Sequence, residues 1–284
     1  MPQALFKVRL PHDEVRLARG SIEDGPGELL TADVTLDGLL AAGGAALAEA
    51  LASAEADGPC PSEAVILAPI DDQEVWCAGV TYKRSKEARM EESTQPDHYD
   101  RVYDADRPEI FFKGNGWRAR GPGETIGIRN DSGWDMAEAE LGLVIAADGT
   151  IVGYVAGNDM SSRTIEGENP LYLPQAKVYD LACALGPAIV PASDGADPEF
   201  PVRMTIIRDG ATLFEGETTT AQLKRSHREL VDHLTRALTF PRGAVLLSGT
   251  GIVPDASVTV KAGDSVRIEM GDLGVLENPV VGIG

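Results

Sequence analysis

The chain has 284 residues, of which 43% are hydrophobic, so it can bury a substantial core and is not predicted to be disordered. Its 45 aspartates and glutamates exceed its 25 lysines and arginines, and the net charge of −20 repels nucleic-acid phosphates and anionic membranes. Aromatic residues make up only 5%, which argues against a stacking surface for single-stranded nucleic acid. We therefore expect neither a nucleic-acid partner nor a membrane partner.

The surroundings of the protein can also be inferred from composition. Arginine outnumbers lysine by 18 to 7, and an acidic, lysine-poor surface is favoured in a salt-rich cytoplasm, so we expect a halophilic source. An ordinary acidic protein from a GC-rich genome is the alternative. The three cysteines lie far apart, which predicts buried thiols in a reducing compartment. No signal peptide and no membrane-spanning stretch is recognisable, so we expect a cytoplasmic protein.

The first 68 residues are predicted to form a small N-terminal α+β lobe. Residues 3–35 have the pattern of short strands, and residues 36–56 are rich in alanine and leucine, as in a helix weakened by Gly43 and Gly44. A linker rich in glycine and proline follows at 58–61. The catalytic domain is then expected over residues 69–284.

Strands dominate the second part of the chain. The exception is the segment 83–107, which is polar, charged and without apolar periodicity, and which we interpret as an active-site lid or a disordered insert. Ser226 and Glu229 have the spacing of a capping box, which predicts a helix from there to about Phe240. Because strands outnumber helices without regular alternation, we predict a β-rich α+β fold with mostly antiparallel or mixed sheets.

Three acidic residues are predicted to converge on one hairpin. Two strand-like runs are joined by Asp148-Gly149, a dipeptide typical of two-residue turns. That turn places Glu138 directly opposite Asp159, and Glu140 lies two residues from Glu138 on the same face. Carboxylates so close together repel one another, and a divalent cation such as Mg²⁺ or Mn²⁺ removes the conflict. A solvated hairpin face is the alternative, and spacing alone does not decide between them.

The order of motifs resembles that of the fumarylacetoacetate hydrolase family from about residue 74 to the end. The family pattern comprises a Glu-x-Glu strand, an Asp-Met-Ser segment with an arginine, Gln-x-Lys, Ser-Gly-Thr and Gly-Asp-x-Val. The corresponding residues are Glu138-Ala139-Glu140, Asp159 to Arg163, Gln175-Ala176-Lys177, Ser248-Gly249-Thr250 and Gly263 to Val266. The resemblance implies a mixed β-roll, Mg²⁺ bound by Glu138, Glu140 and Asp159, and a homodimer or homotetramer.

One departure from the family pattern bears on the chemistry. Hydrolases of the family carry Gly-x-Asn-Tyr-x-x-His-x-x-Glu, whose histidine and glutamate activate a water molecule. Here Ser85 replaces the histidine and Ala88 replaces the glutamate, and a serine is no general base at neutral pH. Glu87 can substitute only if the lid shifts by one residue. Hydrolysis of a carbon–carbon bond is therefore not the expected reaction.

The remaining motifs resemble a subgroup of the family, the 2-keto-3-deoxy-pentonate dehydratases. The resemblance rests on residues 108–113, on residues 165–180 and on the absence of the histidine–glutamate pair. It implies Mg²⁺-dependent dehydration of a 2-dehydro-3-deoxy-D-xylonate or -arabinonate to 2,5-dioxopentanoate in pentose degradation. The alternatives are an acylpyruvate-type hydrolase, a 2-oxo-diacid isomerase or decarboxylase, and a non-catalytic module that binds oxo acids.

Two residues are predicted to transfer protons. Lys177 is the expected base at C3, since we expect a nearby cation to lower its pKa; a permanently charged anchor for the substrate carboxylate is the alternative. Glu109 is expected to transfer protons at C4 and C5, or else to be a partner of Lys113 or Lys177.

Five further residues are predicted to bind the substrate. Thr250 lies in a turn flanked by glycines that can hold a carboxylate. Arg163 and Gln175 are expected to orient sugar hydroxyls, although Arg163 can instead pair only with Glu166. Arg84 and Ser85 are expected to meet the substrate when the lid closes, with a solvated helix face as the alternative.

Overall fold

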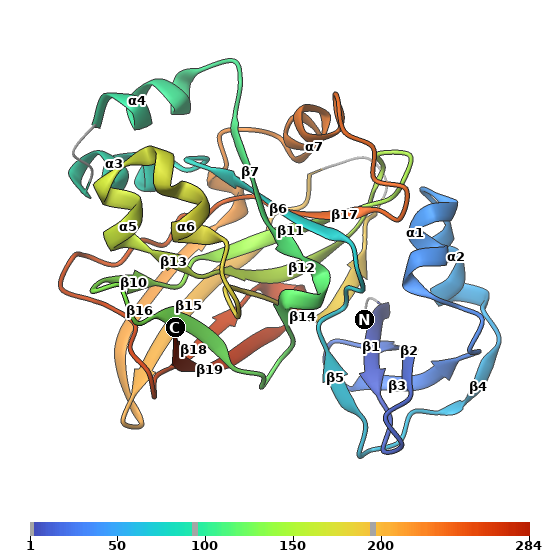
Figure 1. Cartoon of the computed structure of the whole chain (residues 1–284). Helices are drawn as coiled ribbons and strands as arrows, with labels where there is room; N and C mark the ends of the chain where they lie inside the picture. Colours follow the sequence, from blue (N-terminus) through green and yellow to red (C-terminus); the bar gives the residue numbers. More distant parts are fainter. Residues whose placement is uncertain (1–2, 93–95, 194–196) are drawn as a thin grey trace.

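The N-terminal residues form the edge of a sheet and two short helices, drawn in blue in Figure 1. The computed structural model describes residues 3–92, 96–193 and 197–284. The first elements are β1 (Gln3–Arg9), β2 (Val15–Ser21), β3 (Gly25–Leu30), α1 (Leu36–Ala42), α2 (Ala46–Ser53), β4 (Ala56–Pro59) and β5 (Val65–Leu67). The helix predicted over 36–56 is interrupted at Gly43, whose φ of 92° favours glycine.

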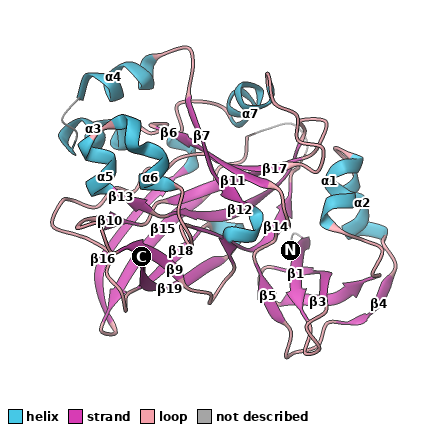
Figure 2. Ribbon diagram, viewed as in Figure 1, coloured by secondary structure: helices cyan, strands magenta, loops and turns pink. Residues whose placement is uncertain are grey.

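The main body consists of strands joined by short helices (Figure 2). Its strands are β6 (Glu74–Gly79), β7 (Glu109–Asn115), β8 (Ala119–Arg120), β9 (Ile126–Arg129), β10 (Asp135–Met136), β11 (Ala139–Ile145), β12 (Ile151–Asp159), β13 (Ser161–Ser162), β14 (Cys183–Pro191), β15 (Pro201–Arg208), β16 (Ala211–Thr219), β17 (Ala244–Leu247), β18 (Ser265–Glu269) and β19 (Val275–Ile283). Its helices are α3 (Lys83–Glu92), α4 (Pro96–Asp104), α5 (Arg163–Glu168), α6 (Leu173–Lys177) and α7 (His227–Thr235), with single 3-10 turns at Gly116–Arg118, Pro170–Tyr172, Thr220–Gln222 and Gly271–Leu273.

The described strands form two main sheets and a short pair. The large sheet has the order β4-β3-β2-β1-β14-β12-β11-β17-β6-β7, with β5 beside β1 and β8 beside β14. The second sheet has the order β16-β15-β18-β19-β9, and β10 pairs with β13. Most neighbours are antiparallel, but β17 runs parallel to β6 and β19 runs parallel to β9. The predicted β-rich α+β fold with mixed sheets is confirmed.

The two sheets pack against each other around one core. Leu143 of the large sheet and Met204 and Ile268 of the second sheet are buried in the same cluster. A further cluster joins the opposite face of the large sheet to the N-terminal helices, for example through Val144 and Leu40. Because side chains alternate along a strand, β11 supplies both clusters. β1 pairs with β14, so the domain boundary predicted near residue 68 falls in a continuous sheet and stays a prediction.

The polar segment 83–107 contains the helices α3 and α4, whereas residues 93–95 lie outside the described residues. Lys86 of α3 contacts Asp100 and Asp104 of α4 at 2.6 and 3.5 Å. Helix α3 has no apolar stripe. It is held in place by these ion pairs and by the small buried residues Ser85 and Ala88. For the described residues of this segment a disordered insert is therefore the wrong alternative, and the helices remain compatible with a lid.

Two local predictions have mixed outcomes. The N-cap is confirmed, since the Ser226 hydroxyl accepts a hydrogen bond from the Glu229 amide at 3.1 Å, but the Glu229 carboxylate pairs with Arg225 instead of completing a capping box. Helix α7 ends at Thr235 rather than near Phe240. Residues 257–263 form a loop, in which the Val260 amide donates to the carbonyl of Asp135 at 2.9 Å. No helix in the described ranges has both the length and the apolar character needed to cross a membrane.

Candidate metal centre and active site

The candidate site lies at one end of four neighbouring strands of the large sheet, β11, β17, β6 and β7. β6 and β17 run parallel and both finish there, so the turn after each strand reaches the site. β7 and β11 run in the opposite direction and begin there, with Glu109 as the first residue of β7. This arrangement places residues that are far apart in sequence around one cavity, and α3, α5 and α6 cover it (Figure 1).

Glu138, Glu140 and Asp159 converge as the hairpin register predicts. Ala139 pairs with Asn158, and the Asp159 amide donates to the Glu138 carbonyl at 3.0 Å, so Glu138 and Asp159 are opposed. The turn itself is longer than two residues, but a bulge after Val144 restores the predicted register. One carboxylate oxygen from each acid lies within 4.8 Å of the others. All three side chains are buried, so the solvated hairpin face is the wrong alternative.

The charges of this triad are only partly balanced by the protein. Burial raises the pKa of Glu140 well above its usual range, and the neighbouring Asp159 and Glu138 raise it further. Glu140 accepts a hydrogen bond from the Gly249 amide at 2.8 Å, which is a neutral donor. Burial likewise raises the pKa of Glu138, although Lys177 opposes the shift. Three buried carboxylates of this kind fit a hard divalent cation, because such cations prefer oxygen ligands.

Asp159 is held by two lysines. Lys113 Nζ lies 2.5 Å from one carboxylate oxygen, and Lys177 Nζ lies 2.8 Å from the other. Burial alone raises the pKa of Asp159, but the two lysines lower it below its ordinary value. Lys113 also donates to the carbonyls of Met160 and Lys177, at 2.9 and 2.5 Å. A fully buried ammonium therefore ties β7 to the segments that carry Asp159 and Lys177.

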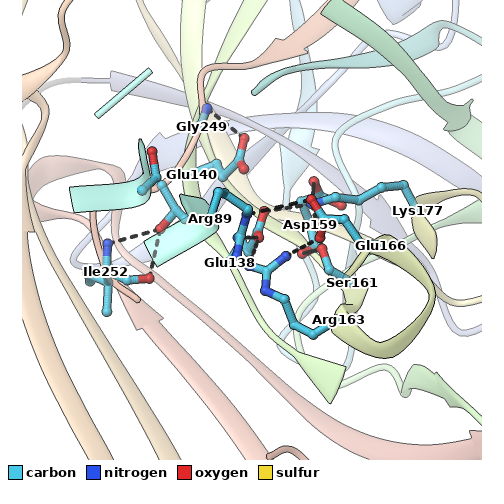
Figure 3. Close-up of polar contacts among 12 residues, drawn as sticks. Arg89, Glu138, Glu140, Asp159, Ser161, Arg163, Glu166, Lys177, Gly249 and Ile252 are labelled. Atoms are coloured by element: carbon cyan, nitrogen blue, oxygen red, sulfur yellow. Dashed lines mark hydrogen bonds and ion pairs between the residues drawn. The ribbon is translucent and has the colours of Figure 1, made fainter. Parts of the chain in front are cut away.

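Lys177 extends towards Asp159 from the right of Figure 3. Its ammonium donates to Glu138, Asp159 and Ser161 at 2.8, 2.8 and 2.6 Å. Burial lowers the pKa of Lys177, but the charges of Asp159 and Glu138 outweigh burial and raise it well above its ordinary value. The predicted fall in the Lys177 pKa is therefore wrong for the metal-free protein. The acids that can hold a cation surround the ammonium and raise its pKa instead.

Glu109 faces the same cavity from the start of β7. Its carboxylate lies over Gly79, where a Cβ would meet the carboxylate oxygen at 2.1 Å, so a side chain at this position would displace the carboxylate. Burial, followed by the negative charge of Glu166, raises the pKa of Glu109 to about 7. The carboxyl group can therefore be either protonated or ionised near neutral pH, as a proton-transfer group requires.

Two arginines surround Glu138 and Glu166. Arg89 of α3 donates to Glu138 Oε1 at 2.9 Å and lies 3.5 Å from Glu166. Arg163 of α5 donates to the same oxygen of Glu138 and to Glu166 at 2.5 Å. We call these four residues the Arg89 cluster (Figure 3). Arg163 thus pairs with Glu166 and with Glu138, and its contact with the sugar hydroxyls stays a prediction.

Thr250 lines the cavity in the turn after β17. Its hydroxyl bonds to the backbone of Ile252, accepting from the amide at 3.2 Å and donating to the carbonyl at 3.3 Å. Gly249 has a φ of 92°, and a Cβ there would lie 2.0 Å from the Thr81 hydroxyl. A side chain is excluded at this position, and its absence allows the amide to reach Glu140.

The other predicted substrate contacts have different positions. Ser85 is buried and lines the cavity, but its hydroxyl donates to the Tyr82 carbonyl at 2.8 Å. Arg84 and Glu87 are exposed on the outer face of α3, which agrees with the solvated alternative for Arg84 and gives no support to Glu87 as a base. Gln175 is also exposed, because Ala176 and Lys177 occupy the inward positions of α6. We therefore do not retain Arg84 and Gln175 as substrate contacts.

The cavity around the triad is small, with a volume of about 30 Å³. A cleft of about 1020 Å³ lies elsewhere, lined by residues that include Trp117, Arg118 and Tyr179, but it contains none of the three carboxylates. We assign the chemistry to the smaller cavity, because the buried ionisable groups gather there.

Three residues of the site were not predicted as site residues from the sequence. Lys113 was considered only as a partner of Glu109, although residues 109, 111 and 113 share one face of a strand. Arg89 could have been found from Ser85, because positions four apart share one face of a helix. Glu166 was considered only as a partner of Arg163, and its contact with Arg89 requires the fold.

Comparisons with known proteins agree with this geometry. The family model described as "Fumarylacetoacetate (FAA) hydrolase C-terminal" matches residues 74–281. A probable 2-keto-3-deoxyxylonate dehydratase of Haloferax volcanii is 52% identical over 213 residues, which cover 75% of this chain and 73% of the relative. A 2-dehydro-3-deoxy-D-arabinonate dehydratase of Saccharolobus solfataricus is 40% identical over 220 residues, covering 76% and 74%. A solved 2-keto-3-deoxy-D-arabinonate dehydratase, complexed with magnesium and 2,5-dioxopentanoate, has a TM-score of 0.83 and 31% identity over 99% of both chains.

Proposed function

Because the chain belongs to the fumarylacetoacetate hydrolase family, we propose that it is a hydro-lyase that converts a 2-keto-3-deoxy-pentonate into 2,5-dioxopentanoate and water. The substrate is 2-dehydro-3-deoxy-D-xylonate or 2-dehydro-3-deoxy-D-arabinonate, as in the relatives' names, and the reaction belongs to pentose degradation. The observation that carries the proposal is one cavity that is lined by three buried carboxylates together with Lys177 and Glu109.

We propose that Glu138, Glu140 and Asp159 hold Mg²⁺, for which Mn²⁺ can substitute. The all-carboxylate donor set supports this choice, and a relative of the same fold binds magnesium. When bound, the cation polarises the C2 keto oxygen and stabilises the negative charge that develops as C3 loses a proton. The carboxylates must stay ionised for this purpose, and the lysines around Asp159 favour its ionised form.

Lys177 is proposed to remove the C3 proton. Its ammonium is held by Glu138 and Asp159, so it gives up its own proton more readily as these acids share their charge with a bound cation. The alternative, a charged anchor for the substrate carboxylate, uses the same position. Loss of a base abolishes turnover, whereas loss of an anchor for the substrate chiefly raises KM. Kinetics of a Lys177 variant therefore separate the two roles.

Glu109 is proposed to give a proton to the departing C4 hydroxyl, which leaves as water. In its ionised form it then takes a proton from C5, and Lys177 returns its proton to C3. C4 is protonated as the C5 hydroxyl loses its proton and becomes the aldehyde. A pKa of about 7 makes both forms accessible. The sum is loss of one water molecule from the substrate, with no net oxidation or reduction.

The arrangement favours elimination over hydrolysis. Ser85 is tied to the backbone of Tyr82, and Ala88 is buried where the hydrolases have a glutamate, so no histidine–glutamate pair is present at these positions. Thr250 lines the cavity, and this position supports its proposed role in substrate binding.

The proposed function is tested with a panel of 2-keto-3-deoxy pentonates and hexonates in the presence of Mg²⁺, scored for 2,5-dioxopentanoate by NMR. We expect product from at least one pentonate, and no activity after chelation with EDTA. Failure to form the product from every pentonate, with the fold intact, would contradict the dehydratase assignment. Loss of the enol absorbance of acylpyruvates would instead support the hydrolase.

We further propose a cytoplasmic homodimer or homotetramer from a halophilic source. The net charge of −20 and the relative from Haloferax volcanii support halophily. A melting temperature that does not rise in molar KCl would argue against it, and light scattering measures the oligomeric state.

A further inference from the structure

A second pocket lies on the face of β7 that points away from the metal centre. It has a volume of about 380 Å³ and lies between β6, the start of β7 and residues 233–238 at the end of α7 (Figure 1). Pro108 and Ile110 line it, whereas Glu109 between them faces the triad, because side chains alternate along a strand. This pocket, which we call the α7 pocket, is therefore separate from the site described above.

Three basic side chains converge on the α7 pocket. Arg107 comes from the loop before β7, and His233 and Arg236 come from the end of α7. Burial lowers the pKa of His233, and the charges of Arg236 and Arg107 lower it further, so both guanidinium groups lie close enough to act on one imidazole. Among the described residues, the wall of this pocket contains no aspartate or glutamate.

The charges of the two arginines are not balanced by the protein. Neither Arg107 nor Arg236 has an ion pair or a side-chain hydrogen bond with a described residue, and the buried Nδ1 of His233 has no hydrogen-bond partner there either. Both acids of α7 have other partners, namely Glu229 with Arg225 and Asp232 with Arg228. In a chain with a net charge of −20, the α7 pocket is therefore a local excess of positive charge.

The larger cleft near Trp117 offers no comparable charge. Its arginines are paired with acids, namely Arg118 with Asp180 at 3.3 Å, Arg120 with Glu124 at 3.9 Å and Arg129 with Asp131 at 2.5 Å. That cleft measures about 1020 Å³ against about 380 Å³ for the α7 pocket. An anion nevertheless gains less in the larger cleft, because the positive charges there are already compensated.

The α7 pocket also has an apolar wall. Trp76, Ile110 and Leu234 line it together with Leu238, which is 43% exposed. An apolar group of a ligand gains free energy by covering these side chains, and an anionic group can accept hydrogen bonds from a guanidinium fork. The volume of about 380 Å³ falls within the range of small-molecule sites.

We propose that the α7 pocket binds a small organic anion, whose carboxylate or phosphate pairs with Arg107 and Arg236 and whose apolar body covers Trp76 and Leu238. The proposal concerns a second site and does not rest on the dehydratase reaction. The alternative is a helix end without a ligand, because cations near the last carbonyls of a helix are stabilising. This alternative accounts for His233 and Arg236, but not for Arg107, which comes from another segment.

The test is calorimetric titration of the folded protein with phenyl phosphate and with phenylacetate. EDTA is present, so that the triad holds no cation and its acids repel both probes. The KCl concentration is the lowest at which circular dichroism shows the native fold, because salt screens the charges of an exposed site. We expect saturable one-to-one binding of at least one anion, and no binding of benzyl alcohol, which has the ring without the charge.

Matched variants locate the binding site. Arg107→Gln and Arg236→Gln should each weaken binding by at least about fivefold, since each removes a charge-assisted hydrogen bond at a partly exposed site. Arg9→Gln removes the same charge from an exposed position on β1, and Arg129→Gln removes it from the larger cleft. Both of these should leave the affinity unchanged. In NMR spectra, the bound anion should shift the ring resonances of His233.

The outcome does not depend on catalysis. Absence of saturable binding of either anion, unchanged affinity in Arg107→Gln or Arg236→Gln, or an equal loss in Arg9→Gln would overturn the proposal. The probes are titrated without metal or substrate, so absence of dehydratase activity leaves this result standing. The two anions also show whether the site prefers a phosphate or a carboxylate.

Discussion

Replacement of Glu109 by glutamine should stabilise the metal-free protein more at high pH than at low pH. Burial raises the pKa of the Glu109 carboxyl from an ordinary 4.5 to about 7. The folded protein therefore binds this proton more tightly than the unfolded chain. The stabilisation from that proton is fully present below about pH 4.5 and is lost as the pH rises through about 7.

The magnitude follows from the shift. At 1.36 kcal/mol per pKa unit, the change from 4.5 to about 7 corresponds to at most about 3 kcal/mol, of which about 2 kcal/mol is lost between pH 5 and pH 8. Glutamine does not ionise, so the variant avoids that loss. The buried amide adds a constant that is independent of pH and cancels in the difference between the two conditions.

The assay is denaturant unfolding of wild type and Glu109→Gln at pH 5 and pH 8, with EDTA present. We expect the stability of the variant relative to wild type to improve by about 2 kcal/mol from pH 5 to pH 8. Glu87→Gln removes a carboxylate from the exposed face of α3 and serves as the control. Equal differences at both pH values for Glu109→Gln would refute the reasoning, as would the same trend in the control.

Three further predictions concern the groups around the carboxylates. Lys113→Met should lower the free energy of unfolding by about 3–5 kcal/mol, because it leaves a buried Asp159 charge with one fewer partner, and urea unfolding measures this; a loss below 1 kcal/mol would contradict the account. Glu140→Gln should weaken Mg²⁺ or Mn²⁺ binding by at least about tenfold in calorimetric titration with the fold retained, and unchanged affinity would remove Glu140 from the ligand set. Gly249→Ala should lower the free energy of unfolding by about 2 kcal/mol or more, because its Cβ would lie 2.0 Å from the Thr81 hydroxyl. Gly210 also has a positive φ but has open space around it, so Gly210→Ala measures the cost of the positive φ alone.

The hairpin that carries the triad could be predicted because its register is set by few residues. Side chains alternate with a period of two, so the turn at Asp148-Gly149 sufficed to place Glu138 opposite Asp159. The turn type was wrong, yet the longer loop and the bulge after Val144 compensate and leave the register unchanged. The family resemblance then supplied the metal, which spacing alone did not decide.

The features that were missed depend on contacts between distant segments. Arg89 and Glu166 are 77 positions apart, and their contact arises only because α3 closes against α5. Gln175 was carried over from a motif, but its place on a one-turn helix directs it outwards while Lys177 points inwards. The Lys177 pKa was expected to fall because only the charge of the cation was considered. The charges of Asp159 and Glu138, which can hold that cation, raise the pKa instead.

The measurement that tests the central claim most directly is hydrogen–deuterium exchange at C3 of 2-oxobutyrate in D2O, followed by NMR. This 2-oxo acid lacks the C4 hydroxyl, so removal of the C3 proton is observed without elimination. We predict exchange that requires Mg²⁺, disappears in Lys177→Met and persists in Arg84→Met. Exchange that continues at the wild-type rate in Lys177→Met, or without any divalent cation, would contradict the account.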